Sequence, residues 1–555
     1  MTSWVRNLAI VGFQIAAVAQ VSFGSHPKIA RDLLPANLDD SVDVIVQYKD
    51  AAFEHIEGKA ASHYAHRLRT LVDKGPLKLI RSELLSLPAR DVVALADDPD
   101  VEFVSPDRQV QAAGFSGTID YSWIAAGAQT ASTQYNLNGS GIGVAVLDSG
   151  IASHQDLTST GKRVQLSFSF VPSDLLSTTD KFGHGTHVAG IIAGNGGIWS
   201  SGSGNNDVRG MAPGVNLINF RVLDSNGLGI DSTIILAIEA AIALKPLYNI
   251  RVINLSIGRS VTESYRNDPL CLAVEQAWNA GIVVVAAAGN GGRSNQSGSQ
   301  GYFSITVPGN DPRVITVGAM NTMGTAPRSD DKMTSYSSKG PTSIDHVVKP
   351  DIVAPGNQVI SLLAKGSTLD QTHPENRVPT SYYDQFNSAY QNDYEYYQLS
   401  GTSMATAIVS GAVALMLQQD PQSTPDDVKY RLMTSAFRGL PAVTTATDAV
   451  TGVTYTDTSD MFTIGAGYMD VSAALQNHST APGSTASPIV IPGFSGHMSI
   501  QLASASAWTN MNVWSTTPVG GTAIMWGTAI MWGTAIMWGT GGPLEAPAYF
   551  LSGDR

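Results

Sequence analysis

The stretch Gly401-Thr-Ser-Met-Ala-Thr-Ala407 is the most informative part of this 555-residue chain. A small, flexible turn there leads into the apolar run 405–419, which contains no proline and is followed by Pro421. The apolar residues of this run recur at the spacing of a helix with a buried face: Ile408, Ala412, Leu415 and Leu417. Ser403 is therefore expected at a helix N-terminus, where unpaired N–H groups favour a nucleophile whose reaction generates negative charge. Taken alone, this stretch is more simply explained by a plain N-cap serine, because Ser and Thr are among the commonest caps.

Two earlier stretches favour the nucleophile. Ile142-Gly-Val-Ala-Val-Leu147 reads as a short buried strand, and it ends in Asp148-Ser-Gly150. Catalytic groups collect at the carboxyl edge of parallel sheets, so this carboxylate is well placed. Gly183-His-Gly-Thr-His-Val-Ala-Gly190 begins a small-residue helix with His184 in its first turn. The chain order Asp, His, Ser is one of the three known orders of the serine-hydrolase triad.

The three stretches together carry a family resemblance. Asp148-Ser-Gly, His184-Gly-Thr-His-Val-Ala-Gly and Gly401-Thr-Ser-Met-Ala-Thr resemble the three catalytic signatures of the subtilase, or subtilisin-like, serine peptidases nearly residue for residue. The resemblance implies a fold in which one parallel sheet brings all three signatures to a single edge.

The same resemblance implies a role for each side chain. Ser403 would attack the scissile carbonyl, His184 would take and return the proton, and Asp148 would orient the imidazole. The family pattern assigns catalysis to His184 and not to His187 in the same turn. Ala407 stands where the family commonly has proline; alanine favours the helix but leaves φ unfixed in the turn that aims the serine.

An amide for the oxyanion is found after another buried strand. By resemblance Asn290, at the end of Ala286-Ala-Ala-Gly-Asn290, would donate to the oxyanion together with the backbone N–H of Ser403. Taken alone, a turn asparagine before Gly291 is the simpler interpretation. The family also implies that an extended substrate is bound by main-chain hydrogen bonds, to the following residues: Leu228, Gly229, Ser256, Ile257, Gly258, Ala288 and Gly289.

The order of strands and helices predicts the architecture. From residue 142 onward, apolar strands alternate with helices, which indicates an α/β fold with a parallel sheet covered by helices on both faces. Before it, a strand at 41–48, a helical stretch 51–72, a strand-like stretch 77–87, a helix 89–97 and a strand 101–104 predict a small α+β domain. This module resembles the inhibitor-type propeptide of subtilases, with an unrelated α+β domain as the alternative.

The predicted parts of the chain follow in order. Residues 1–19 resemble a secretory signal, because Arg6 precedes a short apolar run and an Ala-x-Ala site. The remaining parts are a propeptide at 38–111, a catalytic domain at 115–477, a Pro/Ser/Thr-rich linker at 478–490 and a tail at 491–555. In the tail Gly-Thr-Ala-Ile-Met-Trp occurs three times in tandem from Gly521, which is compatible with added β-structure, surface binding or self-assembly.

Composition and short apolar runs restrict partners and cofactors. The formal net charge of −13 argues against nucleic-acid binding, and the apolar N-terminal run is too short to span a bilayer. The chemistry requires no cofactor. Asp156 matches a position that ligates structural calcium in some subtilases, but the following loop 195–207 does not match, so calcium has no assigned site.

The sequence thus predicts a secreted serine endopeptidase, made as a self-processing zymogen whose propeptide inhibits it, with protein or peptide substrates. Two alternatives use the same residues. One is a non-catalytic protein-binding module on the same fold. The other is an esterase or ligase with the same triad, because acyl transfer to water or to another nucleophile needs the same groups.

Overall fold

The structure is a computed structural model. It describes residues 26–30, 33, 37–64, 68, 71–107, 109–111, 120–159, 161–196, 208–294, 299–379, 394–448, 452–492, 498–503, 505–508, 513–514 and 554. Contacts divide the chain into two compact units. The first comprises Met1–Pro76 and Arg81–Pro106, and the second Leu77–Ile80 and Asp107–Arg555. The predicted signal at 1–19 and the tandem repeats lie outside the described residues.

The first unit is built on a four-stranded sheet with the order β2-β3-β1-β4. Strand β1 pairs antiparallel with β3 and with β4, and its Val44, Val46 and Tyr48 enter the core of the unit. The elements are β1 (Ser41–Tyr48), α1 (Asp50–Ile56), α2 (Ala60–Tyr64), β2 (Val72–Leu77), β3 (Ser82–Pro88), η2 (Ala89–Asp91), α3 (Val92–Ala96) and β4 (Val101–Pro106). The short turn η1 (Lys78–Ile80), between β2 and β3, is counted with the second unit.

Two predictions in this unit are wrong in their bounds. The helix expected over 51–72 is divided into α1 and α2, and Gly58 between them has a φ of 65°, a left-handed conformation that ends a helix. The strand expected over 77–87 begins only at Ser82, because Lys78–Ile80 is a 3₁₀ turn and Arg81 has a φ of 50°. The strand predicted at 41–48 is confirmed.

The second unit is organised around an eight-stranded sheet. Its order is β15-β14-β11-β10-β6-β8-β7, with β16 also paired to β14. All pairs are parallel except β14 with β15. The strands are β6 (Gly143–Asp148), β7 (Val164–Ser169), β8 (Asn216–Arg221), β10 (Ile250–Leu255), β11 (Val283–Ala287), β14 (Ile315–Asn321), β15 (Lys332–Met333) and β16 (Ile352–Pro355). The predicted α/β class is therefore confirmed.

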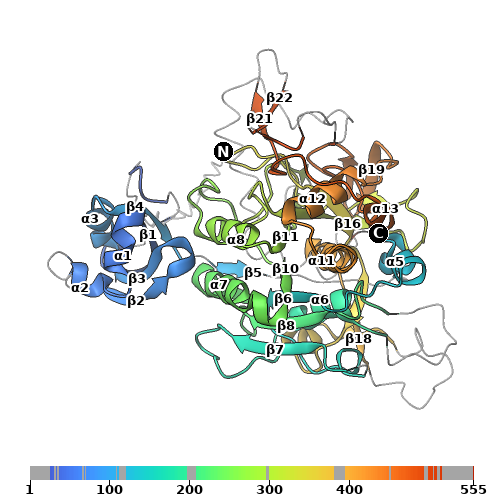
Figure 1. Cartoon of the computed structure of the whole chain (residues 1–555), viewed down its shortest axis with the longest axis horizontal. Helices are drawn as coiled ribbons and strands as arrows, with labels where there is room; N and C mark the ends of the chain where they lie inside the picture. The colour runs from blue at the N-terminus through green and yellow to red at the C-terminus, as the bar shows by residue number, and fades with distance from the viewer. Residues whose placement is uncertain are drawn as a thin grey trace, which may run out of the picture. The chain divides into compact units, whose positions relative to one another are not determined.

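Helices cover both faces of this sheet. Helices α7 (Asp231–Tyr248) and α8 (Pro269–Asn279) pack together on one face, and α6 (His184–Ala193) and α11 (Thr402–Gln419) pack together on the other (Figure 1). Helix α11 is buried on all sides from Thr402 to Leu417, so it is a central helix and has no exposed face over that length. Its hydroxyl-bearing start is consequently fixed by packing around the whole helix.

Shorter elements complete the second unit. The further helices are α4 (Ser122–Ala125), α5 (Ala128–Tyr135), η3 (Gln155–Leu157), α9 (Thr368–Thr372), η5 (Pro374–Asn376), α12 (Pro425–Thr434) and α13 (Val471–Gln476). The two-stranded pairs are β5 (Gln109–Gln111) with β9 (Leu228–Ile230), β12 (Arg293–Ser294) with β13 (Ser299–Gln300), β17 (Val359–Leu362) with β18 (Tyr396–Leu399), β19 (Val443–Thr447) with β20 (Thr454–Thr458), and β21 (Ile489–Pro492) with β22 (Met498–Gln501).

The segment 478–490, which we expected to be a linker, is packed into the second unit. Thr485 and Ser487 are buried there, and the backbone N–H of Thr485 donates to Asp426 at 2.7 Å. Farther along, Trp508 and Trp514 belong to a buried apolar cluster. None of the described helices combines the length and the apolar character needed to cross a bilayer.

Candidate active site

Asp148 and His184 meet where strand β6 ends and helix α6 begins. The imidazole Nδ1 lies 2.8 Å from Oδ1 and 3.0 Å from Oδ2 of the carboxylate, and both side chains are buried. The glycine after the histidine is required by this approach, because a Cβ at Gly185 would lie 2.3 Å from the carbonyl oxygen of Gly150. An imidazole held in this way at Nδ1 presents Nε2 as a base.

Asp180 fixes the start of α6, and sequence reasoning missed it. Its carboxylate accepts hydrogen bonds from the backbone N–H groups of Gly183 at 2.7 Å and Thr186 at 2.8 Å, and from the Thr186 hydroxyl at 2.7 Å. It also accepts from the hydroxyl of Ser149 at 2.8 Å, which itself accepts from the N–H of Gly185. An aspartate shortly before a glycine-rich helix start was the available signal.

Ser403 lies in the first turn of α11, after Gly401 with a φ of 150°. Its hydroxyl donates to the carbonyl oxygen of Ser256 at 3.1 Å, and the Ser256 hydroxyl donates to the Ser403 carbonyl at 2.9 Å. This reciprocal pair holds the helix start against the end of β10. Among the described residues, His184 Nε2 has no hydrogen-bond partner, although α6 and α11 pack side by side.

Asn290 is held beside the same turn. Its Oδ1 accepts from the backbone N–H of Thr402 at 2.9 Å and from the Thr402 hydroxyl at 3.1 Å. The oxygen of the amide is therefore occupied, and its N–H₂ group is the part left to meet a developing negative charge. Gly289 before it has a φ of 102° and could not carry a Cβ, which would lie 2.6 Å from a methyl group of Thr306.

Comparison with known proteins identifies the family. A sequence model described as the subtilase family matches residues 139–467, which is more than half of the chain. This chain belongs to the subtilase family. The predicted resemblance is confirmed.

Individual proteins with similar sequences support the same family assignment. AprX, a serine protease of Bacillus subtilis, is 40% identical over 301 residues, which cover 53% of this chain and 61% of AprX. Subtilisin E of the same species is 34% identical over 360 residues, which cover 65% of this chain and 76% of subtilisin E. A crystal structure of fervidolysin from Fervidobacterium pennivorans, described as a keratinolytic enzyme related to subtilisin, has a TM-score of 0.55 at 22% identity. That match covers 84% of this chain and 64% of fervidolysin, and it shows a shared fold alone.

In this subtilase five of the predicted substrate-binding residues follow the ends of two strands. Ser256, Ile257 and Gly258 continue β10, and Ala288 and Gly289 continue β11. The carbonyl oxygens of Ala288 and Gly289 already accept from the backbone N–H groups of nearby residues, at 3.0 and 2.9 Å. These two residues therefore build the wall beside Asn290, and their carbonyls are engaged within the protein.

Leu228 and Gly229 are already paired with another part of the chain. They belong to β9, which binds β5 antiparallel, with Gly229 opposite Val110 and Leu228 opposite Gln111. Just before β5, the carboxylate of Asp107 accepts from the backbone N–H of Ser232 at 2.8 Å and from its hydroxyl at 2.6 Å. The edge that the family resemblance assigns to substrate is thus covered by the chain that follows the first unit.

His187 lies one turn beyond His184 and differs in its surroundings. Burial, reinforced by the nearby His184, lowers the pKa of His187 to about 3. Its Nε2 lies 3.1 Å from the Val359 carbonyl oxygen and 3.0 Å from that of Tyr397. The ring is therefore neutral and acts as a donor that joins α6 to β17 and β18.

Asp156 is held by protein groups. Its Oδ2 accepts from the hydroxyl of Tyr396 at 2.6 Å, and its backbone N–H donates to His154 Nδ1 at 3.1 Å. Within the described residues, no three histidine, cysteine, aspartate or glutamate side chains gather closely enough to hold a metal ion. Residues 197–207 of the loop that follows α6 lie outside the described residues.

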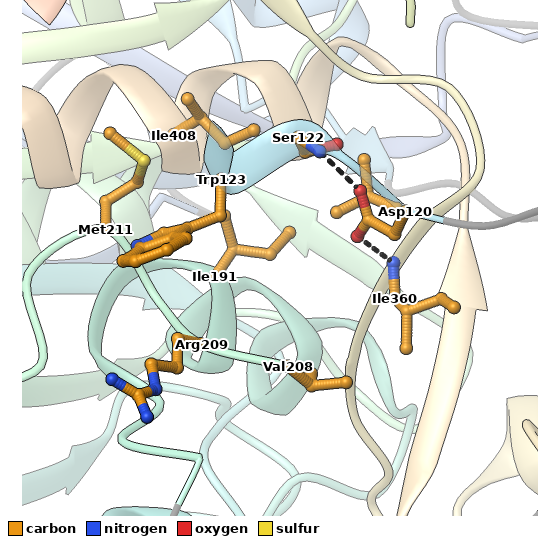
Figure 2. Close-up of a pocket in the computed structure, with 10 residues that line it drawn as sticks. Asp120, Ser122, Trp123, Ile191, Val208, Arg209, Met211, Ile360 and Ile408 are labelled. Atoms are coloured by element: carbon orange, nitrogen blue, oxygen red, sulfur yellow. Dashed lines mark hydrogen bonds between the residues drawn. The ribbon is translucent and has the colours of Figure 1, made fainter. Parts of the chain in front are cut away.

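A small cavity lies beside Ile191, near the C-terminal end of α6 (Figure 2). It offers about 30 Å³, which is room for about one water molecule, and it is lined by Asp120, Trp123, Ile191, Met211 and Ile408 among others. Burial raises the pKa of the Asp120 carboxyl, which accepts from the N–H groups of Ser122 and Ile360 at 2.7 Å each. This cavity is a packing space between the helices and is too small for a peptide.

Proposed function

We propose that this subtilase is a secreted serine endopeptidase, made as a self-processing zymogen, that cleaves protein or peptide substrates through an acyl-enzyme. The observation that carries the proposal is the buried Asp148–His184 pair. The imidazole Nε2 of this pair is without a partner among the described residues, and α6 packs beside α11, whose first turn carries Ser403. A buried nitrogen without a partner is costly unless it serves a purpose, and accepting a proton from a nucleophile is such a purpose.

The proposed reaction begins with a rotation of one side chain. The Ser403 hydroxyl leaves the Ser256 carbonyl, donates to His184 Nε2 and attacks the scissile carbonyl carbon while its proton passes to the imidazole. Asp148 accepts from Nδ1–H throughout and stabilises the imidazolium. The carbonyl oxygen becomes an oxyanion, which receives hydrogen bonds from the Asn290 side chain and from the backbone N–H of Ser403.

The intermediate then collapses. The C–N bond breaks, the proton on His184 passes to the leaving amine, and an ester remains between the acyl group and Ser403. Water attacks this ester, gives its proton to His184, and releases the acid while the proton returns to the serine oxygen. These steps need no cofactor, and structural calcium stays without an assigned site.

The first unit is proposed to be the propeptide, and β5 supports this role. An antiparallel partner on β9 is the arrangement expected for a peptide that adds a strand at the binding edge. A segment bound in this way would exclude substrate until it is cut, and we propose that the cut falls near residues 107–115, which include β5. Secretion is proposed from the signal predicted at 1–19, and nucleic acid is not expected among the partners.

Casein hydrolysis tests the reaction. We expect mature protein to degrade casein, a serine-directed covalent inhibitor to stop it, and Ser403→Ala to abolish it. Ser410→Ala is the matched control, because it removes another buried hydroxyl from the same helix and should leave most of the activity. Absence of hydrolysis by a processed wild type would favour the protein-binding alternative, and ester cleavage without peptide cleavage would favour the esterase or ligase.

Mass spectrometry of the secreted protein tests the zymogen. The wild type should lose its N-terminal module by cleavage within 107–115, and Ser403→Ala should retain it. Identical processing of the two proteins would contradict self-cleavage.

A further inference from the structure

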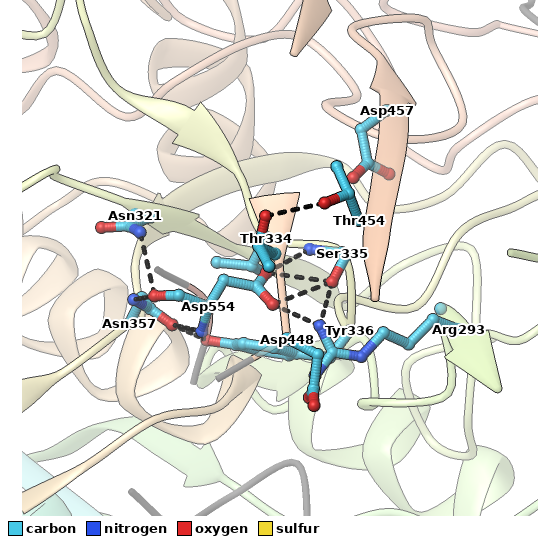
Figure 3. Close-up of polar contacts among 12 residues, drawn as sticks. Arg293, Asn321, Thr334, Ser335, Tyr336, Asn357, Asp448, Thr454, Asp457 and Asp554 are labelled. Atoms are coloured by element: carbon cyan, nitrogen blue, oxygen red, sulfur yellow. Dashed lines mark hydrogen bonds and ion pairs between the residues drawn. The ribbon is translucent and has the colours of Figure 1, made fainter. Parts of the chain in front are cut away.

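A buried polar site surrounds residue 554, far from the rest of the described chain in sequence. Figure 3 shows Asp554 among Arg293, Ser335, Asn357 and Asp448. Arg293 and Asp554 form an ion pair, as do Arg293 and Asp448, and all three side chains are fully buried. A second buried ion pair lies nearby, between Lys339 Nζ and Asp457 Oδ1 at 3.1 Å. A buried guanidinium between two carboxylates requires close geometry to be stable.

Both the side chain and the main chain of Asp554 form hydrogen bonds. Its carboxylate accepts from the backbone N–H of Ser335 at 2.6 Å and from the Ser335 hydroxyl at 2.9 Å. Its backbone N–H donates to Asn357 Oδ1 at 3.0 Å, and its carbonyl oxygen accepts from Asn357 Nδ2 at 3.0 Å. The Asn357 amide thus binds the main chain of Asp554, and Ser335 and Arg293 bind its carboxylate. A glutamate would be one methylene too long to satisfy both sets.

The residues that hold Asp554 are linked to the candidate active site by short paths. Arg293 follows Asn290 by three positions, and the N–H of Gly292 between them donates to the Tyr336 carbonyl at 2.8 Å. The Tyr336 hydroxyl donates to the Gly356 carbonyl at 3.0 Å. That same carbonyl accepts from the N–H of Gly401 at 2.7 Å, two residues before Ser403.

We propose that Arg293, Ser335 and Asn357 form a receptor for Asp554, and that Asp554 docked there is a positioning residue for the loop that carries Asn290. It acts by adding contacts that join three segments, those around 293, 335 and 357, through one residue. When the receptor is empty, the buried N–H of Ser335 and one arm of the Arg293 guanidinium lose their partner, and the loop shifts to recover one. The effect on rate rests on the proposed peptidase function.

The test compares the full-length chain with Asp554→Ala and Asp554→Asn, and with Asp330→Ala as a control that removes an exposed carboxylate. Active sites are titrated with the serine-directed inhibitor, so that only folded enzyme is counted. We expect kcat per titrated site to fall about tenfold in Asp554→Ala with KM changed less than about twofold, since small displacements of catalytic groups lower rates steeply. Asp554→Asn, which keeps the shape and loses the ion pair, should fall between, and Asp330→Ala should match the wild type.

A double-mutant cycle separates positioning from general stability. If Asp554 acts through Asn290, the loss of kcat caused by Asp554→Ala should nearly disappear in an Asn290→Ala background. Equal losses in both backgrounds would overturn the route through Asn290. An unchanged kcat per titrated site in Asp554→Ala would overturn the positioning role.

The binding of Asp554 to its receptor can also be tested by a measurement that does not depend on enzyme activity. In a Ser403→Ala background, Asp554→Ala should lower the melting temperature by about 5 °C or more, and Asp330→Ala should not. An unchanged melting temperature would overturn the receptor. A wild type that hydrolyses nothing would instead contradict the proposed function, while the melting temperatures would still decide whether Asp554 docks.

Discussion

The candidate active site and the Asp554 receptor are both buried, and both pair a carboxylate with a cationic or basic side chain. They differ in whether polar atoms remain without a hydrogen-bond partner. At the receptor each polar atom of Asp554 has a partner. At the active site His184 Nε2 has no partner among the described residues, and the amide of Asn290 is anchored through its oxygen only.

This difference separates reactivity from stability within one unit. A buried residue whose polar atoms are all partnered contributes to the folded state and offers no free atom to a substrate. A site whose imidazole nitrogen and amide N–H₂ group lack partners among the described residues gives up some stability, and those groups can meet the charges of a transition state. Substitutions at the two kinds of site should therefore change different measurements.

The largest expected effect among these predictions is on kcat, when the side-chain amide of Asn290 is removed. Asn290→Ala should lower kcat about 10²- to 10³-fold, the size known for the oxyanion asparagine of subtilisins, with KM changed little. Initial rates on a peptide substrate, divided by titrated active sites, measure it. A rise in KM at constant kcat would instead assign Asn290 to ground-state binding.

Asp180→Ala should act mainly on stability. The substitution leaves the buried N–H groups of Gly183 and Thr186 without an acceptor, so we expect the free energy of unfolding to fall by about 3 kcal/mol. Urea denaturation in a Ser403→Ala background measures this. Asp180→Asn retains one acceptor oxygen and should lose less. If Asp180→Ala kept full stability, the carboxylate would not be what holds the start of α6.

His187 predicts a pH dependence of stability. Its folded pKa of about 3 lies below the unfolded value of about 6.5, so the unfolded chain binds the extra proton as pH falls. Its contribution is present above about pH 6.5 and is lost towards pH 3, amounting to about 2 kcal/mol between pH 7 and pH 5. His187→Gln in a Ser403→Ala background should remove this slope, and equal slopes in the two proteins would refute it.

The smallest expected effect is at Tyr396. Tyr396→Phe removes one donor to the buried carboxylate of Asp156 and should cost about 1 kcal/mol of unfolding free energy, with little change in kcat. Tyr394→Phe is the matched control, because it removes a hydroxyl from the same segment and keeps the ring beside Arg377. A loss as large in the control as in Tyr396→Phe would assign the effect to the segment rather than to the hydrogen bond.

Prediction from sequence succeeded where a local pattern carries the information. The apolar run before Asp148 predicted strand β6, and the apolar run after Ser403 predicted helix α11. Each run also showed which residue stands at the end of the strand or at the start of the helix. Bounds failed where a single residue departs from the pattern. Gly58 and Arg81 have positive φ values that no periodicity reveals.

The missed residues share a different cause. Tyr396 reaches Asp156 across 240 positions, and Asp554 reaches Ser335 across 219. A single tyrosine or aspartate side chain has no local sequence pattern that identifies a partner so far away in the chain. Asp180 was nearer to being found, because it precedes a helix start, but its bond to Ser149 depends on how β6 and α6 are brought together.

The sequence by itself determined the family, the α/β class and which acid, imidazole, alcohol and amide to examine, because these depend on short motifs and on the period of apolar residues. Only the tertiary structure decided that Ser403 donates to Ser256, that His187 is a neutral internal donor, and that Asp554 enters a site built by 293, 335 and 357. Hydrogen-bond partners and burial are properties of how distant segments pack together, and a linear pattern carries no distances between them.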